Sequence, residues 1–167
     1  MIRALLAAST LAALLLAAPA AAQQRRGAVD VESYRIELLI DPAQQTLSER
    51  AQATFVPTED RVQTVSFELH NSLNLIAAEA EGGQALQTSR RFNEHAVDLF
   101  FPQPLERGRP VTVTFQISGA LRGDEESPVY GITFAAIRPD HAFLLYPARW
   151  FPVSGYTTDR YQMELTV

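Results

Sequence analysis

Apolar and polar residues alternate along much of the chain, and a period of two residues is typical of a β-strand with one buried face. The cleanest case is Val111 to Ser118, where valine, phenylalanine and isoleucine occupy one face and threonine, glutamine and serine the other. The same alternation runs from Ser33 to Ile40 and from Arg160 to Val167. No convincing helical repeat accompanies it. The pattern therefore predicts a chain built from strands.

Turn signals divide this pattern into short segments. Asp41-Pro42 and Glu81-Gly82-Gly83 are turns, Pro102 to Pro110 is a proline-bounded loop, and Leu121 to Tyr130 and Pro147 to Thr158 are irregular surface segments. Strands spaced about 8 to 12 residues apart indicate a sandwich or an open barrel. The predicted strands are Ser33–Ile40, Leu47–Val56, Val62–Leu69, Leu73–Ala80, Gln84–Arg90, His95–Phe101, Val111–Ser118, Gly131–Ile137, His141–Tyr146 and Arg160–Val167.

The first 22 residues have the pattern of a secretory signal peptide. Arg3 supplies a positive charge, Leu5 to Ala18 is apolar, and Ala20-Ala21-Ala22 is a small-residue cleavage site. We expect cleavage after Ala22 and a periplasmic or secreted protein that has no membrane segment after cleavage, since the apolar run is shorter than the ~20 residues of a spanning helix. An uncleaved anchor helix is the alternative.

The organisation that follows is a polar tether over residues 23–30 and one domain over residues 31–167. A domain rarely stops inside an amphipathic strand with no polar tail behind it, and Arg160 to Val167 is such a strand. We therefore expect the chain to be a fragment of a longer protein.

Composition removes several classes of function. The chain has no cysteine, so it can form neither a disulfide framework nor a thiolate metal site, and it cannot be a lipoprotein. Its 14 basic residues are all arginine and its formal net charge is −5. A mildly acidic chain whose arginine pairs, Arg25-Arg26 and Arg90-Arg91, are isolated is not expected to bind nucleic acid.

The sequence offers no recognisable catalytic or metal centre. Its three histidines, His70, His95 and His141, lie far apart at predicted strand ends, and we do not expect them to converge on a metal. A G-x-S-x-G elbow is absent, and Gly82-Gly83 lacks the further glycines of a phosphate loop. Asp124-Glu125-Glu126 lacks the glycine and the ligand spacing of a calcium loop. We predict no catalytic residue, metal or cofactor in this chain.

One late segment is richer in special residues than a sandwich requires. It runs from Tyr146 to Pro152, and its two prolines fix the backbone. Arg149 lies among aromatic residues, where it can stack on a ring or form a bidentate ion pair. Either contact would hold the loop against a neighbouring surface. The alternative is that the segment packs only within its own domain.

These residues, taken in order, resemble the N-terminal β domain of the aminopeptidase N-like zinc metallopeptidases. The resemblance spans about Val31 to Val167. It is carried by Asp30 to Ile36 with the Asp41-Pro42 turn, by Leu99 to Gly108, which reads L-F-F-P-Q-P-L-E-R-G, and by Ala148-Arg149-Trp150-Phe151-Pro152.

The resemblance implies a saddle-like antiparallel β-sandwich or open barrel that packs on a separate catalytic domain and closes one side of its active-site cleft. In that family the zinc-binding H-E-x-x-H helix and the G-x-M-E-N strand lie downstream of this domain. Zinc is therefore expected in the missing catalytic domain, and this chain alone is expected to be inactive. The residues expected at the interface between the domains are Tyr146, Ala148, Arg149, Trp150, Phe151 and Pro152.

Three departures from the family pattern stand out. Leu144 occupies a substrate-rim position where many members carry a glutamate or glutamine that binds the substrate's amino group, and leucine cannot accept that hydrogen bond. Val153 to Thr157 replaces C-x-D-x-P, and Glu49 replaces a usual glycine. The competing hypothesis is a free-standing periplasmic or secreted β-sandwich that binds a partner through exposed Trp150, Phe151 and Tyr156.

Overall fold

The computed structural model describes residues 28–123, 131–154 and 160–167. The predicted signal peptide, Tyr156 and the acidic run at Asp124 to Glu126 lie outside these residues. Within the described part of the chain, no helix is long and apolar enough to cross a membrane.

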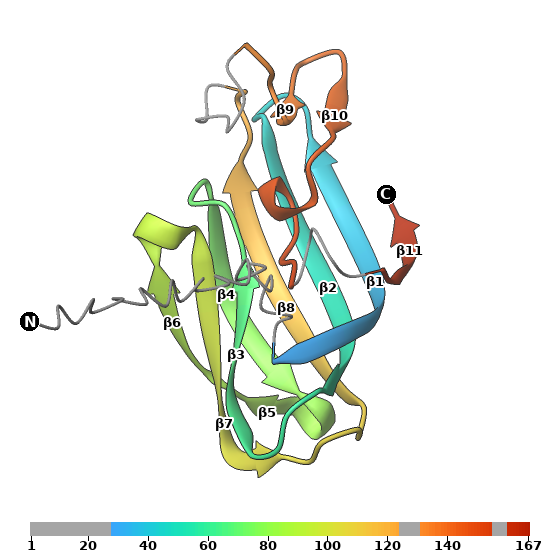
Figure 1. The fold of residues 1–167 in the computed structure, drawn as a ribbon. Coiled ribbons are helices and arrows are strands. Elements are labelled where there is room, and N and C mark those ends of the chain that lie inside the picture. The colour runs from blue at the N-terminus through green and yellow to red at the C-terminus, as the bar shows by residue number, and fades with distance from the viewer. Residues whose placement is uncertain (1–27, 124–130, 155–159) are drawn as a thin grey trace, which may run out of the picture.

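The described chain is all-β, as the alternation predicts, and its sheets are open rather than closed into a barrel (Figure 1). A six-stranded sheet has the order β11-β1-β2-β8-β4-β5, a three-stranded sheet the order β3-β7-β6, and β9 pairs with β10. The strands are β1 Val29–Asp41, β2 Thr46–Pro57, β3 Val62–Glu68, β4 Leu73–Ala80, β5 Gln84–Ala85, β6 Gln87–Arg91, β7 Ala96–Leu105, β8 Val111–Ala120, β9 Ala135–Ile137, β10 Ala142–Leu144 and β11 Gln162–Thr166. Three short 3₁₀ helices join them: η1 Glu81–Gly83, η2 Phe92–Glu94 and η3 Pro147–Arg149.

The two larger sheets pack face to face around one aromatic core. Phe67 of β3 meets Phe55 of β2 and Phe115 of β8 edge to face, with ring centroids 6.0 and 5.0 Å apart. All three side chains are fully buried. Burying aromatic rings of this size is the main favourable term available to a chain that lacks disulfides.

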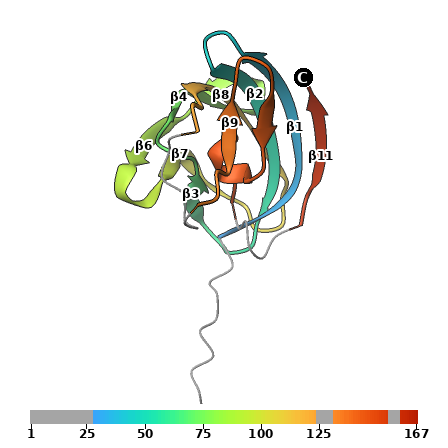
Figure 2. The ribbon, with the colours of Figure 1, turned by 90° about the horizontal axis from the view of Figure 1, so that it is seen from above.

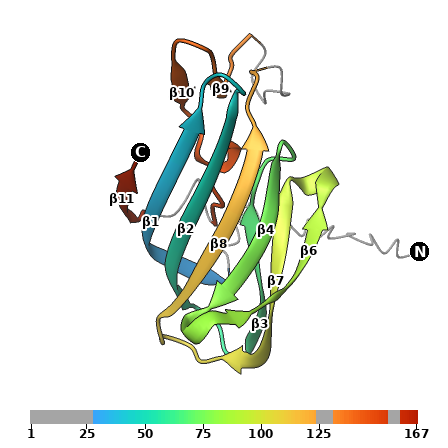
Figure 3. The same ribbon diagram turned by 180° about the vertical axis from the view of Figure 1, so that it is seen from behind.

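The six-stranded sheet follows the predicted alternation closely. Along β2 the inward row is buried from Leu47 to Phe55, while Ser48 and Arg50 face outward. Figure 3 shows β1, β2, β8 and β4 side by side on that outer face. From above (Figure 2), these strands curve around β9 and η3, so residues 131–154 fill the inner side of the sheet. We call residues 131–154 the cover.

The edges of the sheets differ from the sequence expectation in four places. β1 begins at Val29, so Val29 and Asp30 belong to a strand rather than to the tether. β11 runs parallel to β1, from Ser33↔Gln162 to Glu37↔Thr166, so the sheet is not purely antiparallel. Parallel neighbours cannot be joined by a tight hairpin, and here β2 to β10 lie between β1 and β11 in the chain.

The other two differences concern strand ends. The predicted strand Gln84–Arg90 is broken at buried Leu86, which separates β5 in one sheet from β6 in the other. The predicted Pro102–Pro110 loop starts too early, because β7 continues to Leu105. Pro102 and Pro104 fall within the register shift between Thr64↔Phe100 and Val62↔Leu105, where no ladder hydrogen bond from their nitrogens is needed.

Candidate functional site

The Tyr146–Pro152 segment forms a compact turn that is fastened to the end of β3. Pro147 starts η3, and the backbone N–H groups of Trp150 and Phe151 donate to the Pro147 carbonyl at 2.9 and 3.0 Å. Val153 exchanges two backbone hydrogen bonds with Glu68, at 2.6 and 2.9 Å. His70 N–H donates to the Ala148 carbonyl at 2.9 Å. An isolated β-bridge at Val153 and the bond from His70 to Ala148 thus attach the segment to the end of β3.

Its apolar side chains point into this domain's own core. Phe151 is fully buried and Trp150 only 6% exposed, and Ala148 and Pro152 are buried too. The Phe151 ring meets Tyr34 at 5.1 Å and Trp150 at 4.5 Å, in both cases edge to face. The expectation that Trp150 and Phe151 form an exposed contact patch is therefore wrong, because the curved sheet offers them a buried site.

The remaining positions of the segment are half-buried. Tyr146 packs edge to face on Phe134 at 5.2 Å, and Arg149 lies close enough to His70 to affect its pKa. Leu144 ends β10, pairs with Ala135 and packs against the edge of the core. The structure brings Leu144 and the segment together in the cover. A role for them at a substrate rim or a domain interface stays a prediction.

Two of the three histidines do converge, which the sequence analysis did not expect. The rings of His70 and His95 stack with centroids 5.1 Å apart and an interplanar angle of 12°. They meet because β3 and β7 are antiparallel neighbours, and Leu69 N–H donates to the His95 carbonyl at 2.6 Å at the end of that ladder. His141 lies elsewhere, bonded to Asp140 at 2.8 Å. The feature of the sequence that pointed to this pair is that both histidines lie at the ends of predicted strands.

The surroundings of His70 hold it in the neutral form. Its Nδ1 accepts the Ser72 backbone N–H at 3.3 Å and lies 2.8 Å from the Ser72 hydroxyl, so the ring proton belongs on Nε2. Burial, together with the charges of nearby Arg149, His95 and Arg90, lowers the pKa of His70 from 6.5 to about 4. Arg90 itself donates to the backbone carbonyls of Leu69 and His70.

This pair does not fit a zinc site. A zinc ion needs three or four protein ligands, and among the described residues no group of three or more histidines and carboxylates could hold a metal ion. The charged groups that act on His70 are all cationic, which opposes the binding of a divalent cation. The stacked histidines are therefore a structural feature at the junction of β3 and the cover.

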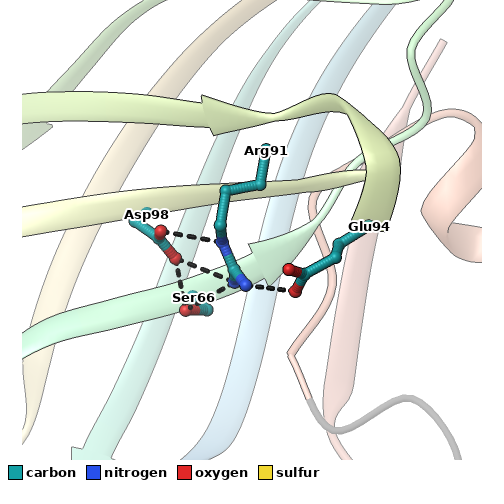
Figure 4. Close-up of polar contacts among 4 residues, drawn as sticks. All are labelled: Ser66, Arg91, Glu94 and Asp98. Atoms are coloured by element: carbon teal, nitrogen blue, oxygen red, sulfur yellow. Dashed lines mark hydrogen bonds and ion pairs between the residues drawn. The ribbon is translucent and has the colours of Figure 1, made fainter.

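A second polar cluster, at the three-stranded sheet, pairs one arginine with two carboxylates and a serine (Figure 4). Arg91 bonds both carboxylate oxygens of Asp98, at 2.8 and 3.0 Å, and also pairs with Glu94. The Ser66 hydroxyl donates to Asp98 at 2.5 Å. No histidine lies among these four residues, and both carboxylates are paired with Arg91, so Ser66 lacks the histidine base that usually activates a serine nucleophile. The cluster ties β3, β6 and β7 together.

The outer face of the six-stranded sheet carries two shallow hollows. One, of about 530 Å³, is lined by residues that include Leu39, Arg50 and Ile76. The other, of about 430 Å³, is lined by residues that include Arg35 and Thr112. No histidine is among the described residues that line either hollow, so their serines lack the usual partner for nucleophilic chemistry.

Apolar side chains are exposed at the edge of the six-stranded sheet that β11 forms. Met163 and Leu165 of β11 pair with buried Tyr34 and Ile36, so they share the inner face of the sheet. Yet Met163 is 40%, Leu165 44% and Val167 76% exposed. A sheet edge of this kind is normally covered by another element. We call these three residues the β11 row.

The fold was compared with those of known proteins. No protein-family profile and no curated protein sequence matches the chain. Among solved structures, the M1 zinc metallopeptidase from Deinococcus radiodurans superposes with a TM-score of 0.65 at 19% sequence identity, over 84% of this chain and 32% of that one. A mutant of that enzyme bound to a Tyr-Ser-Ala substrate gives 0.65 at 18% identity over the same shares.

A two-domain M1 zinc metallopeptidase mutant bound to L-arginine gives a TM-score of 0.59 at 19% identity, again over 84% of this chain and 32% of that one. These neighbours agree with the family resemblance at the level of fold, and their partial coverage is consistent with an N-terminal domain. The chain therefore has the fold of one part of an M1 zinc metallopeptidase and spans about a third of the length of such enzymes.

Proposed function

We propose that this chain is the non-catalytic N-terminal domain of an exported zinc metallopeptidase, and that it packs on a downstream catalytic domain and walls its active site. The observation that carries the proposal is the shared fold: M1 zinc metallopeptidases contain it within about a third of their length. Peptide hydrolysis would then belong to the full-length protein. The Tyr-Ser-Ala substrate bound by one neighbour supports a peptide as the substrate class.

Zinc would be held by the remainder of the protein. The described residues supply no set of ligands for it, and the His70–His95 pair is surrounded by cations. The role of this domain is then steric and electrostatic, since it limits which substrates reach the metal. Export is proposed on the pattern of Met1 to Ala22, which places the enzyme in the periplasm or outside the cell.

The β11 row supports a specific docking edge. Met163 and Leu165 expose inner-face apolar groups, and exposed Val167 follows them in the chain, so covering the row would remove apolar surface from water at about 25 cal/mol per Å². Leu39 and Ile76 are also exposed, but they lie on the outer face, away from this row. They offer a matched comparison.

The proposal is tested on the complete reading frame of the gene, with the 167-residue chain beside it. We expect hydrolysis of an aminoacyl reporter by the full-length protein, its loss on treatment with a zinc chelator, and no hydrolysis by the chain alone. Leu165→Glu should reduce the activity of the full-length protein by disturbing the docking edge, while Leu39→Glu should leave it unchanged. Zinc-dependent hydrolysis by the 167-residue chain itself would contradict the proposal.

A further inference from the structure

Glu49 occupies a position where the strand pattern calls for an apolar residue. It lies in the inward row of β2 between Leu47 and Ala51, and it pairs with Leu38 of β1 and Ile117 of β8. All four neighbours are buried apolar residues. A carboxyl group has thus been placed on the inner face of the central strand of the six-stranded sheet.

The carboxyl group of Glu49 has no compensating contact within the described chain. The residue is only 6% exposed, and neither carboxyl oxygen has a hydrogen-bond partner among the described residues. An ionised carboxylate buried in this way is very costly, so the group stays protonated. Burial accordingly raises the pKa of Glu49 from 4.5 to about 9, and no charged group contributes to that shift.

Among the described residues, no charged side chain contributes to the pKa of Glu49. Leu38 and Ile36 line the inner face of β1, and Ile117 and Phe115 that of β8. From the cover, the residues in the same core are Ala135, Ile137, Trp150, Phe151 and Val153. Ionisation of Glu49 therefore has no nearby counter-charge, and the carboxylate can only be stabilised by water.

The elements around Glu49 are attached with unequal numbers of backbone hydrogen bonds. On both sides β2 is held by long ladders, to β1 over Val29–Asp41 and to β8 over Val111–Ala120. The cover is held by fewer bonds at this end: Ile137 N–H donates to the Leu121 carbonyl at 2.7 Å, and Gln45 Nε2 donates to the Ile137 carbonyl at 2.8 Å. Elements with few backbone hydrogen bonds open first.

We propose that Glu49 is a pH-sensitive switch for the cover: while its carboxyl group is protonated residues 131–154 stay closed on the sheet, and when alkaline conditions remove the proton they open so that water reaches the carboxylate. The sign follows from linkage. The closed form binds the Glu49 proton more tightly than a solvated glutamate does, so raising the pH toward 9 favours the open form. The proposal does not depend on the peptidase function.

The fluorescence of Trp150 can report the opening of the cover. Trp150 is the sole tryptophan, is buried, and belongs to the cover. Acrylamide quenching of its fluorescence and the far-ultraviolet circular dichroism of the 167-residue chain would be measured from about pH 6 to pH 10. We expect the quenching constant to rise several-fold as the pH approaches 9, while the β-sheet signal stays constant.

Three variants make the test specific. Glu49→Gln keeps the shape of the side chain and cannot ionise, so its quenching should stay flat, and it retains every tyrosine whose ionisation could disturb the tryptophan signal. Glu49→Leu should behave in the same way if the glutamine variant folds poorly. Glu37→Gln, which alters an exposed glutamate on the outer face, should keep the wild-type transition.

Several outcomes would overturn the proposal. A rise in quenching that persists in both Glu49 variants would assign it to another group. A wild-type chain with unchanged quenching up to pH 10 would show that the carboxyl group does not control the cover. Loss of the β-sheet signal together with the rise in quenching would mean that the whole domain unfolds, rather than that the cover opens.

Discussion

The central strands and the cover are held in place by different means. β1, β2 and β8 are joined by ladders of ten or more residue pairs, and their side chains alternate between core and solvent. The cover contains only two three-residue strands, which pair with each other, and it is fixed by Trp150, Phe151 and Val153 in the core.

The sheet and the cover differ in which interactions hold them in place. In the sheet, backbone hydrogen bonds and apolar burial act at the same residues, so the local pattern and the tertiary position agree. The cover is attached by a few buried apolar side chains and by isolated backbone hydrogen bonds to β3 and Leu121, without a long ladder. A variant in the cover should therefore loosen the cover before the sheet unfolds, whereas a variant in the sheet should destabilise the whole domain.

Removing the main anchor of the cover should have the largest effect. Phe151→Ala deletes a fully buried ring that contacts Tyr34 and Trp150, and should lower the free energy of unfolding by about 3–5 kcal/mol in urea denaturation. Phe115→Ala removes an equally buried ring from the sheet and should cost a similar amount. In Phe151→Ala, Trp150 should become accessible to quencher at a lower urea concentration than the one at which the β-sheet signal falls. In Phe115→Ala, the two changes should coincide.

The control for these variants is Phe92→Ala, because that ring is exposed and should change stability by less than about 0.5 kcal/mol. A loss below about 1 kcal/mol for Phe151→Ala would contradict its role as an anchor.

A smaller loss is expected where two parts of the sheet approach most closely. A Cβ atom at Gly119 of β8 would lie 2.3 Å from the Ser72 carbonyl oxygen and 2.7 Å from a Leu73 methyl carbon. Because the nearest atom is backbone, Gly119→Ala should lower the free energy of unfolding by about 1–3 kcal/mol. Ser118→Ala, on the neighbouring residue, should be nearly neutral, and equal stabilities of the two variants would show that the close approach relaxes freely.

The junction of the cover with β3 should be sensitive to acid. The pKa of His70 is about 4 in the folded chain against an ordinary 6.5, so its contribution to stability is present above pH 6.5 and is lost as the pH falls toward 4. We expect a loss of about 1–2 kcal/mol over that interval. The raised pKa of Glu49 acts in the opposite direction between pH 4.5 and 9 and would mask the effect.

The measurement is therefore made in a Glu49→Gln background, by urea denaturation at several pH values. Adding His70→Gln should flatten the acid dependence, whereas His141→Gln, which alters an exposed histidine, should leave it intact. An unchanged slope after His70→Gln would assign the acid sensitivity to other groups.

The smallest effect is expected at β11. Arg35 and Glu164 form an ion pair at 3.0 Å, and both side chains are about two-thirds exposed. A double-mutant cycle with Arg35→Ala and Glu164→Ala should give a coupling below about 1 kcal/mol that weakens further in high salt. A larger, salt-resistant coupling would mean that this ion pair, rather than the pairing of β11 with β1, holds the last strand.

Much of the fold could be predicted from residue order. Every predicted strand overlaps an observed one, and Val111 to Ser118 shows why: the buried residues of β8 all belong to its apolar row, and its polar row is half-buried or exposed. The errors lie where a residue's neighbours come from distant sequence. Leu86 breaks a predicted strand because it is buried where the chain passes between sheets, and His70 meets His95 through the register of β3 with β7.

The sequence by itself determined the all-β class, the positions of the strands and the lack of a recognisable catalytic motif, because strand formation follows a period of two that is local in the chain. The tertiary structure alone decided that Trp150 and Phe151 are buried, that β11 joins β1 in parallel, and that Glu49 is buried with no hydrogen-bond partner among the residues described. Burial and pairing are set by which surfaces meet, and that information is distributed over residues far apart in the sequence.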